Sequence, residues 1–203
     1  MIDTLDRKIR QMYLALEDIK SEDFSKIKIE RGETADGFYC AIYFNDSTSE
    51  VELANVASLL ISNIACLKDH LKIWCKKHGR SFEGDKLIDS NLSVALVHDL
   101  WNVDKHAELN KPPRSGHHPK LTGFKRVLAL SSGDKTGSSS SFSFDPRTGE
   151  VIIDTSGSGT AQIELFAQIV DENNTVLGLL SKICKQAVAA WEQELKKAGV
   201  PIP

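Results

Sequence analysis

The sequence lacks the features of secreted and membrane-spanning chains. Its four cysteines, Cys40, Cys66, Cys75 and Cys184, show no CxxC pairing, so the sequence does not predict a disulfide framework. The N-terminal segment is charged from Asp3 onward, which is unlike a signal peptide. No continuous apolar run approaches the roughly 20 residues that cross a bilayer. We therefore expect a soluble cytoplasmic protein with buried free thiols and no membrane contact.

The chain also lacks a strong charge of either sign. Its 203 residues have a formal net charge of −3, with 41% hydrophobic and 26% charged residues, which is ordinary globular usage. This balance gives no overall attraction for nucleic acid, so a contact with RNA or DNA would need a local basic patch. The length suits one domain with a sizeable core, and we predict a single domain over residues 1–203.

Common enzyme motifs are missing as well. No HExxH, GxSxG or GxGxxG occurs. The segment Gly133–Gly137 lacks the spacing of a phosphate loop and no helix is predicted after it, so it is interpreted as a hairpin loop. His117 and His118 lie side by side in a proline-rich loop, without a partner at ligand spacing. The sequence therefore predicts no metal site and no cofactor.

Apolar residues recur at helical spacing in four segments. An N-terminal helix is predicted over residues 3–19 and a C-terminal helix over about 174–198. Between them, at about 50–109, two longer helices are predicted, from Ser49 to His78 and from Leu87 to Leu109. The connection GRSFEGD is short, so we expect these two helices to be antiparallel neighbours.

Alternating and aromatic-rich segments predict strands. KIKIE and FYCAIYF, within residues 26–44, predict a β-hairpin. An antiparallel meander is predicted at about 121–171, with strands at 124–130, 141–144, 150–153 and 162–170. The predicted fold class is α+β: an antiparallel long-helix pair, preceded by a helix and a hairpin and followed by an antiparallel sheet and a C-terminal helix.

The segment Ser90–Asn110 is predicted to be one helix that carries two different arcs. One arc is polar and collects His98, Asn102, Lys105 and His106. Burying such groups costs several kcal/mol unless they are hydrogen-bonded. The other arc is an apolar seam that must be buried, formed by Leu92, Leu96, Leu100, Val103 and Ala107.

Three interpretations of the polar arc stay open. Antiparallel packing would bring it against Asn63 and His70 of the first long helix, where Asn63, His70, Asn102 and His106 would form a buried network that fixes register. Alternatively, a small site lies between the helices, with His106 as acid or base, Asn102 as an orienting amide and Lys105 as an anion-binding cation. In the third interpretation, the arc is a partner surface.

Two segments, Asn63–Leu71 (NIACLKDHL) and Leu100–His106 (LWNVDKH), resemble a group of uncharacterised bacterial proteins. The first long helix of these proteins carries Asn-Leu-Arg-Ser-Ala-Leu-Asp-His-Leu, and the second carries Asn-Ile-Asp-Lys-His. The resemblance covers roughly residues 55–109. The helix pair is similar to HEPN-type helical domains, many of which are metal-independent RNases in toxin, antiviral or RNA-processing systems.

The resemblance implies a motif Arg-x(4 to 6)-His on the second helix, which commonly acts across a dimer. Asn102 and His106 match the Asn and His of this motif, whereas Trp101 occupies the place of the arginine. The arginine of the upstream helix is here Ala65. Lys105 would keep a positive charge but not the planar fork of an arginine.

From these departures we expect a non-catalytic, interaction-type HEPN-like protein in a stress, defence or mobile-element context, with a homodimer or protein partner. One alternative is a metal-independent RNase, with RNA as substrate and His106 deprotonating a 2′-hydroxyl. Another is a small-ligand or anion binder in the helix crevice. The candidate catalytic residues are His106, Asn102 and Lys105, and the candidate binding residues are Asp69, His70, Asn63 and His98.

Overall fold

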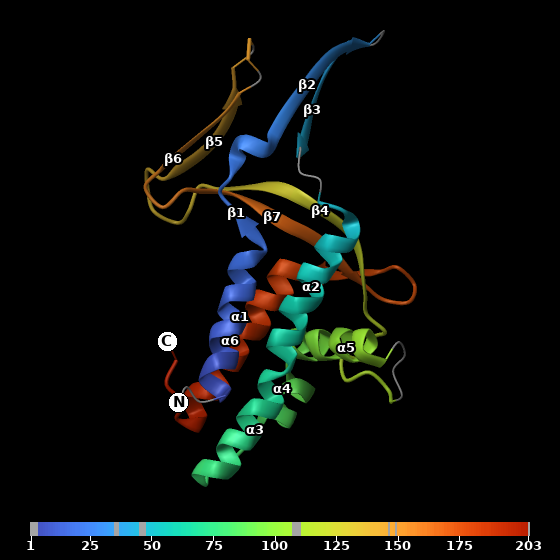
Figure 1. Cartoon of the computed structure of the whole chain (residues 1–203), viewed down its shortest axis with the longest axis vertical. Coiled ribbons are helices and arrows are strands. Elements are labelled where there is room, and N and C mark those ends of the chain that lie inside the picture. Colours follow the sequence, from blue (N-terminus) through green and yellow to red (C-terminus); the bar gives the residue numbers. More distant parts are fainter. Residues whose placement is uncertain are drawn as a thin grey trace. The chain divides into compact units, whose positions relative to one another are not determined.

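The computed structural model in Figure 1 describes residues 4–34, 37–44, 48–106, 111–145, 147–148 and 150–202, and within it the chain divides into two compact units. The first unit contains Met1–Ile19, Glu50–Lys125 and Phe166–Pro203. The second contains Lys20–Ser49 and Arg126–Leu165. Helices and antiparallel strands are both present, so the predicted α+β class is confirmed. That the two units act as a single domain stays a prediction.

The first unit is built mainly from helices. α1 packs against α2 and α3, and α5 packs against α2, α4 and α6. Fully buried side chains on these helices form its core, among them Ile9, Leu60, Leu96 and Trp191, and each contributes about 1.5–3 kcal/mol by leaving water. The helices are α1 (Thr4–Asp18), α2 (Glu50–Ala65), α3 (Leu67–His78), α4 (Gly84–Ser90), α5 (Leu92–His106) and α6 (Leu180–Ala198).

The predicted N-terminal helix is confirmed as α1, which buries Leu5, Ile9, Met12 and Ala15 at helical spacing. The C-terminal helix α6 ends before Gly199 as predicted, because this glycine has a φ of 83° that few other residues adopt. Its predicted start was too early. Residues Val176–Leu179 form strand β8, which pairs antiparallel with β7 (Thr160–Val170), and the helix begins only at Leu180.

The first predicted long helix is present as α2 and α3, with a turn at Cys66 between them. Backbone hydrogen bonds continue across this turn, since the Cys66 N–H donates to the Ser62 carbonyl and the His70 N–H donates to the Cys66 carbonyl. The helix ends at Gly79 as predicted.

Taken together, Glu50–His78 forms a helical segment of 29 residues that is long and apolar enough to cross a membrane. About 44% of its most apolar stretch is buried inside the protein. Core helices of soluble proteins satisfy the same criterion of length and composition.

The predicted start of the second long helix is wrong. α4 ends at Ser90, Asn91 is extended, and α5 begins at Leu92. The Asn91 side-chain oxygen accepts a hydrogen bond from the Val94 N–H at 3.1 Å, so Asn91 is the N-cap of α5. Leu92 is 56% exposed and does not belong to the buried seam. The predicted seam member Ala107 lies outside the described residues.

The antiparallel pairing of the two predicted long helices is not confirmed. α5 packs against α2, and in Figure 1 it lies across the direction of α2. The additional helix α4 gives the connection a second bend before α5 begins. Because Asn91 caps a new helix instead of continuing α4, the two predicted segments do not form a simple helical hairpin.

The second unit is built mainly from strands. The predicted hairpin is confirmed as β2 (Ile27–Thr34) and β3 (Gly37–Phe44), with a register from Ile27 opposite Phe44 to Thr34 opposite Gly37. β5 (Ser139–Phe144) and β6 (Val151–Ser156) form a second antiparallel pair. The short β1 (Lys20–Ser21) pairs with β7, and a 3₁₀ turn at Phe24–Lys26 follows it.

The predicted meander is wrong, although its four strands are present. β7 lies between β1 and β4 (Lys120–Ser131), whereas β5 and β6 form a separate two-stranded sheet. β7 buries every second residue from Ile163 to Ile169, and this apolar face favours pairing inside the larger sheet. In β5, by contrast, every second residue is an exposed serine. The hairpin of β5 and β6 therefore has no fully buried apolar face that would favour a place inside the larger sheet.

We predict that Asn91→Ala lowers the free energy of unfolding by about 1 kcal/mol, because the Val94 N–H loses its acceptor at the start of α5. Urea denaturation followed by circular dichroism measures this change. The control is Asn55→Ala, which replaces an exposed residue inside α2 and should leave stability equal or slightly higher. Equal stability of the two variants would contradict the assigned cap.

Candidate functional site

The polar arc lies on one face of α5, as its helical spacing predicts. We call His98, Trp101, Asn102, Lys105 and His106 the α5 face. Lys105 and His106 are exposed, and Trp101 is half-buried. The Lys105 ammonium lies 4.9 Å from the centroid of the Trp101 ring, which is a cation–π contact. The His98 ring meets Trp101 edge-on, with 5.9 Å between the ring centroids.

Inside the α5 face, Asn102 and His98 form a direct hydrogen bond. The Asn102 side-chain N–H donates to Nδ1 of His98 at 3.0 Å. An amide N–H only donates, so Nδ1 accepts, and the neutral imidazole carries its proton on Nε2. Burial lowers the pKa of His98, the positive charges of Lys68 and Arg114 lower it further, and Asp99 and Asp69 oppose this shift. The fold therefore favours the neutral ring.

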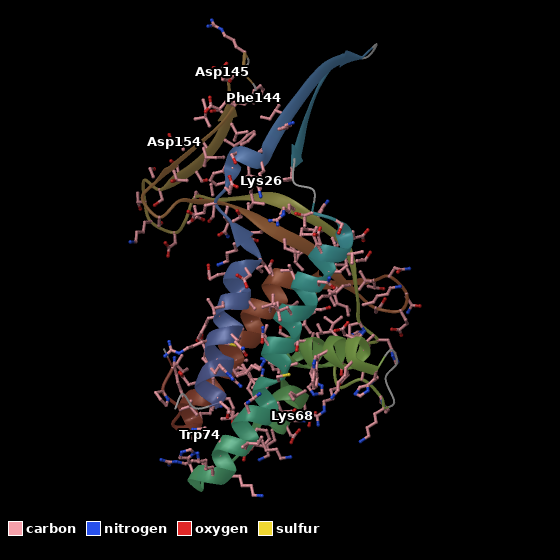
Figure 2. The ribbon with its side chains drawn as sticks, viewed as in Figure 1. Lys26, Lys68, Trp74, Phe144, Asp145 and Asp154 are labelled. Atoms are coloured by element: carbon pink, nitrogen blue, oxygen red, sulfur yellow. The ribbon has the colours of Figure 1, made fainter. Side chains whose placement is uncertain are left out.

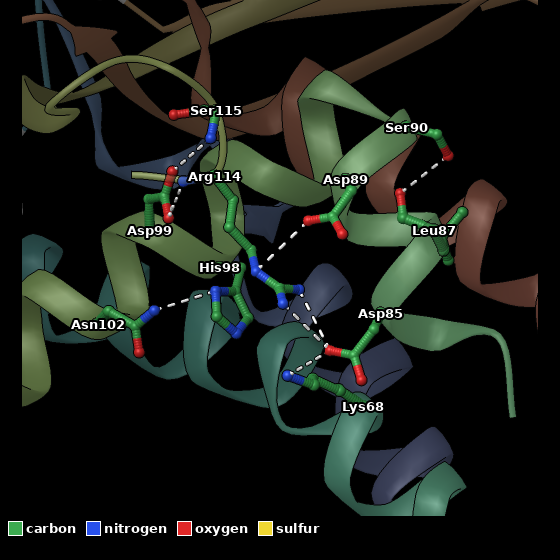
Figure 3. A network of polar contacts seen from close by, with 10 residues as sticks. All are labelled: Lys68, Asp85, Leu87, Asp89, Ser90, His98, Asp99, Asn102, Arg114 and Ser115. Atoms are coloured by element: carbon green, nitrogen blue, oxygen red, sulfur yellow. Dashed lines mark hydrogen bonds and ion pairs between the residues drawn. The ribbon is translucent and has the colours of Figure 1, made fainter. Parts of the chain in front are cut away.

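A charged cluster lies beside His98, and Figure 3 shows its contacts. We call Lys68, Asp85, Asp89, Asp99 and Arg114 the Arg114 cluster. Two guanidinium nitrogens of Arg114 lie 3.3 Å from an Asp85 oxygen, and its Nε lies 3.5 Å from an Asp89 oxygen. Lys68 on α3 contacts the same Asp85 oxygen at 2.9 Å. The hydrogen bond from Lys68 is the main reason why the pKa of Asp85 is lowered.

Asp99 holds the loop that carries Arg114. Its side chain is only 2% exposed, yet it is a carboxylate. Its two oxygens accept the backbone N–H groups of Arg114 at 3.1 Å and Ser115 at 2.8 Å. A buried charge needs such partners, and hydrogen bonds to a charged acceptor are strong ones. This contact fixes the loop after α5 against the helix and thereby positions the Arg114 side chain.

In the structure, Asn63 contacts Lys8 of α1, and the charges of Lys8 and Arg7 on the same helix act on His70. The Asn63 side-chain oxygen is buried and accepts a hydrogen bond from the Lys8 ammonium of α1 at 2.9 Å. Burial lowers the pKa of His70, and the charge of Lys8 lowers it further, against the effect of Asp69. The interpretation in which Asn63, His70, Asn102 and His106 form one buried network is therefore wrong, since His106 is exposed.

The predicted acid–base group is only partly brought together. Asn102 contacts His98, Lys105 contacts Trp101, and His106 stands exposed in the last turn of α5. Asp69 is exposed on α3, and its charge acts on both His98 and His70. The catalytic and binding roles of these residues stay predictions.

Sequence reasoning missed the Arg114 cluster. One signal was present, because Asp99 interrupts the apolar run VALVHDL and a carboxylate there needs a partner. Nothing in the spacing pointed to Arg114, which follows Asp99 by 15 residues and lies beyond a pair of prolines. Lys68 and Asp85 come from two further helices, α3 and α4.

The crevice between α2 and α5 holds a pocket of about 210 Å³. Asp104 lines it, whereas the predicted anion-binding residue Lys105 is not among its lining residues. Within the described ranges, no group of three or more His, Cys, Asp or Glu side chains is arranged to hold a metal ion.

Comparison with known proteins adds no relative: no family model, curated protein or solved structure matches the chain. The resemblance to HEPN-type domains therefore stays a prediction.

We predict that Asp99→Asn lowers the free energy of unfolding by about 2 kcal/mol, because the new amide N–H would face one of the two backbone N–H groups. Chemical denaturation at neutral pH measures the loss. The matched control is Asp89→Asn, which removes an exposed carboxylate of the same cluster and should cost less than about 1 kcal/mol. A smaller effect at Asp99 than at Asp89 would show that the loop contact does not stabilise the fold.

We also predict that stability falls as the pH drops from about 7 to about 5, and that His98→Gln reduces this fall. The pKa of His98 is lowered in the folded chain, so the unfolded chain takes up the proton first and acid favours unfolding. The pKa of His70 is lowered as well, so part of the dependence of stability on pH should remain in His98→Gln. The urea midpoint of unfolding, measured across this pH range, tests the prediction. If the midpoint changed equally with pH in the wild type and in His98→Gln, the prediction would be contradicted.

Proposed function

We propose that this chain is a non-catalytic interaction protein that binds through the α5 face, with a second copy of the same chain as its partner. The observation that carries the proposal is the half-exposed Trp101 ring with the Lys105 ammonium over it. Tryptophan is enriched among the residues that dominate binding energy at interfaces. Polar and charged residues around it, such as Asn102 and His106, suit the rim of such a contact.

The contacts of His98 and Arg114 leave neither of these two groups free to act in RNA cleavage. A general base needs a free lone pair, but Nδ1 of His98 already accepts from Asn102. Stabilising a phosphate transition state needs an available cation, but the Arg114 guanidinium already contacts Asp85 and Asp89. His98 and Arg114 are thus engaged within the chain, whereas the candidate base His106 and the candidate cation Lys105 are exposed, so incubation with RNA decides between binding and cleavage.

The same contacts support a preorganised binding surface. Asp99 fixes the loop against α5, and Asn102 fixes the His98 ring that meets Trp101. A surface that is already ordered loses less conformational entropy when it binds. In a two-fold contact, the same side chains occur on both sides, so that one substitution removes the aromatic group twice.

We predict that Trp101→Ala weakens self-association by at least about tenfold, measured by sedimentation equilibrium of the full chain. The matched control is Trp74→Ala, which removes a half-buried tryptophan on α3 (Figure 2). The Trp74 ring stacks on His78 of the same helix. This control should leave self-association unchanged. A wild-type chain that stays monomeric at all accessible concentrations, or equal effects of both variants, would overturn the proposal.

A second measurement tests the catalytic alternative. Purified protein incubated with mixed RNA in the presence of a metal chelator should leave the RNA intact. Metal-independent cleavage that disappears in His106→Ala, while a catalytically irrelevant change such as Asn55→Ala retains it, would replace the binding proposal with an RNase.

A further inference from the structure

The pocket between α2 and α5 is independent of the α5 face. Its α2 wall comes from Ala54, Ser58 and Ile61, which share one face of that helix at helical spacing. Leu100 and Val103 of α5 form part of the opposite wall. The start of β4 adds further side chains, and all lining residues belong to the first unit.

The interior of this pocket is mainly apolar. Ile61 and Leu100 are buried, and Val103, Leu121 and Phe124 are half-buried around it. Its volume is about 210 Å³, and an apolar cavity of about 150 Å³ is already large enough to bind benzene. Water in such a space finds few hydrogen-bond partners, so its displacement by an apolar group is favourable. One branched aliphatic or aromatic side chain suits this space.

Two opposite charges line the same pocket. Asp104 comes from α5 and Lys120 from the first position of β4, and both are exposed. Neither makes an ion pair within 4.0 Å with another residue in the part of the chain that the structure describes. Ser58 adds a hydroxyl group to the wall. The pocket therefore offers an acceptor for a cation and a donor for an anion next to an apolar interior.

We propose that this pocket binds a free apolar α-amino acid. The ligand's side chain would occupy the apolar interior, its ammonium group would contact Asp104, and its carboxylate would contact Lys120. A zwitterion is the small ligand that uses both charges while keeping an apolar body. Since exposed charge pairs contribute modestly, most of the affinity comes from the side chain, and the two charges supply selectivity.

The test is an NMR titration of the full chain with L-leucine, supported by three probes that each lack part of the zwitterion. Isopentylamine keeps only the ammonium group, isovalerate keeps only the carboxylate and is one carbon shorter, and N-acetyl-leucine methylamide keeps neither charge. L-leucine should bind saturably and shift the amide signals of Leu100 and Val103. The neutral probe should bind several-fold more weakly than L-leucine.

Three variants locate the site and separate the two charges. Ala54→Leu fills the pocket and should abolish binding, whereas the adjacent exposed Asn55→Leu should not change it. Asp104→Asn should weaken L-leucine and isopentylamine by about two- to fivefold but not isovalerate. Lys120→Gln should weaken L-leucine and isovalerate but not isopentylamine.

The proposal is overturned if L-leucine, L-valine and L-phenylalanine all fail to bind saturably at millimolar concentrations. It is also overturned if Ala54→Leu, shown to be folded by its NMR spectrum, binds as well as the wild type, or if the neutral probe binds as tightly as L-leucine.

Discussion

The buried carboxylate of Asp99 is the interaction on which the candidate site depends. A carboxylate at a position that is 2% exposed would be costly alone, so the chain must supply donors to it. The N–H groups of Arg114 and Ser115 do so from the loop after α5. Because the acceptor is on the helix and the donors are on the loop backbone, the contact fixes where the Arg114 side chain begins. The Arg114 cluster follows from that position.

Charge balance inside the Arg114 cluster then shapes the α5 face. Burial lowers the pKa of His98, and the positive charges of Lys68 and Arg114, which share Asp85, lower it further. The neutral His98 ring is thereby favoured, and it accepts a hydrogen bond from Asn102 and meets Trp101 edge-on. Within the polar arc, His98 and Asn102 are thus used to hold the structure. Lys105, which lies over the Trp101 ring, is exposed. The binding proposal depends on this division.

Parts of both the fold and the site were predictable because they depend on local interactions. The spacing of Leu5, Ile9 and Met12 is enough to define α1, and the polar arc does lie on one face of α5. The errors came from competition between local and distant partners. Asn91 had the chemistry of an N-cap, yet apolar periodicity alone suggested that the helix continued through it. Asn63 was expected to face the polar arc of α5, but its side-chain oxygen accepts a hydrogen bond from Lys8 of α1.

The sequence by itself determined the helix ends at Gly79 and Gly199 and the hairpin of β2 and β3, since caps, turns and periodicity act over a few residues. Only the tertiary structure decided that β7 lies beside β1 and β4, that Arg114 joins Asp99, and that Asp104 and Lys120 line one pocket. These arrangements unite residues far apart in the chain. They are selected by burial of apolar faces and by the need of each buried polar group for a partner, and neither has a fixed sequence spacing.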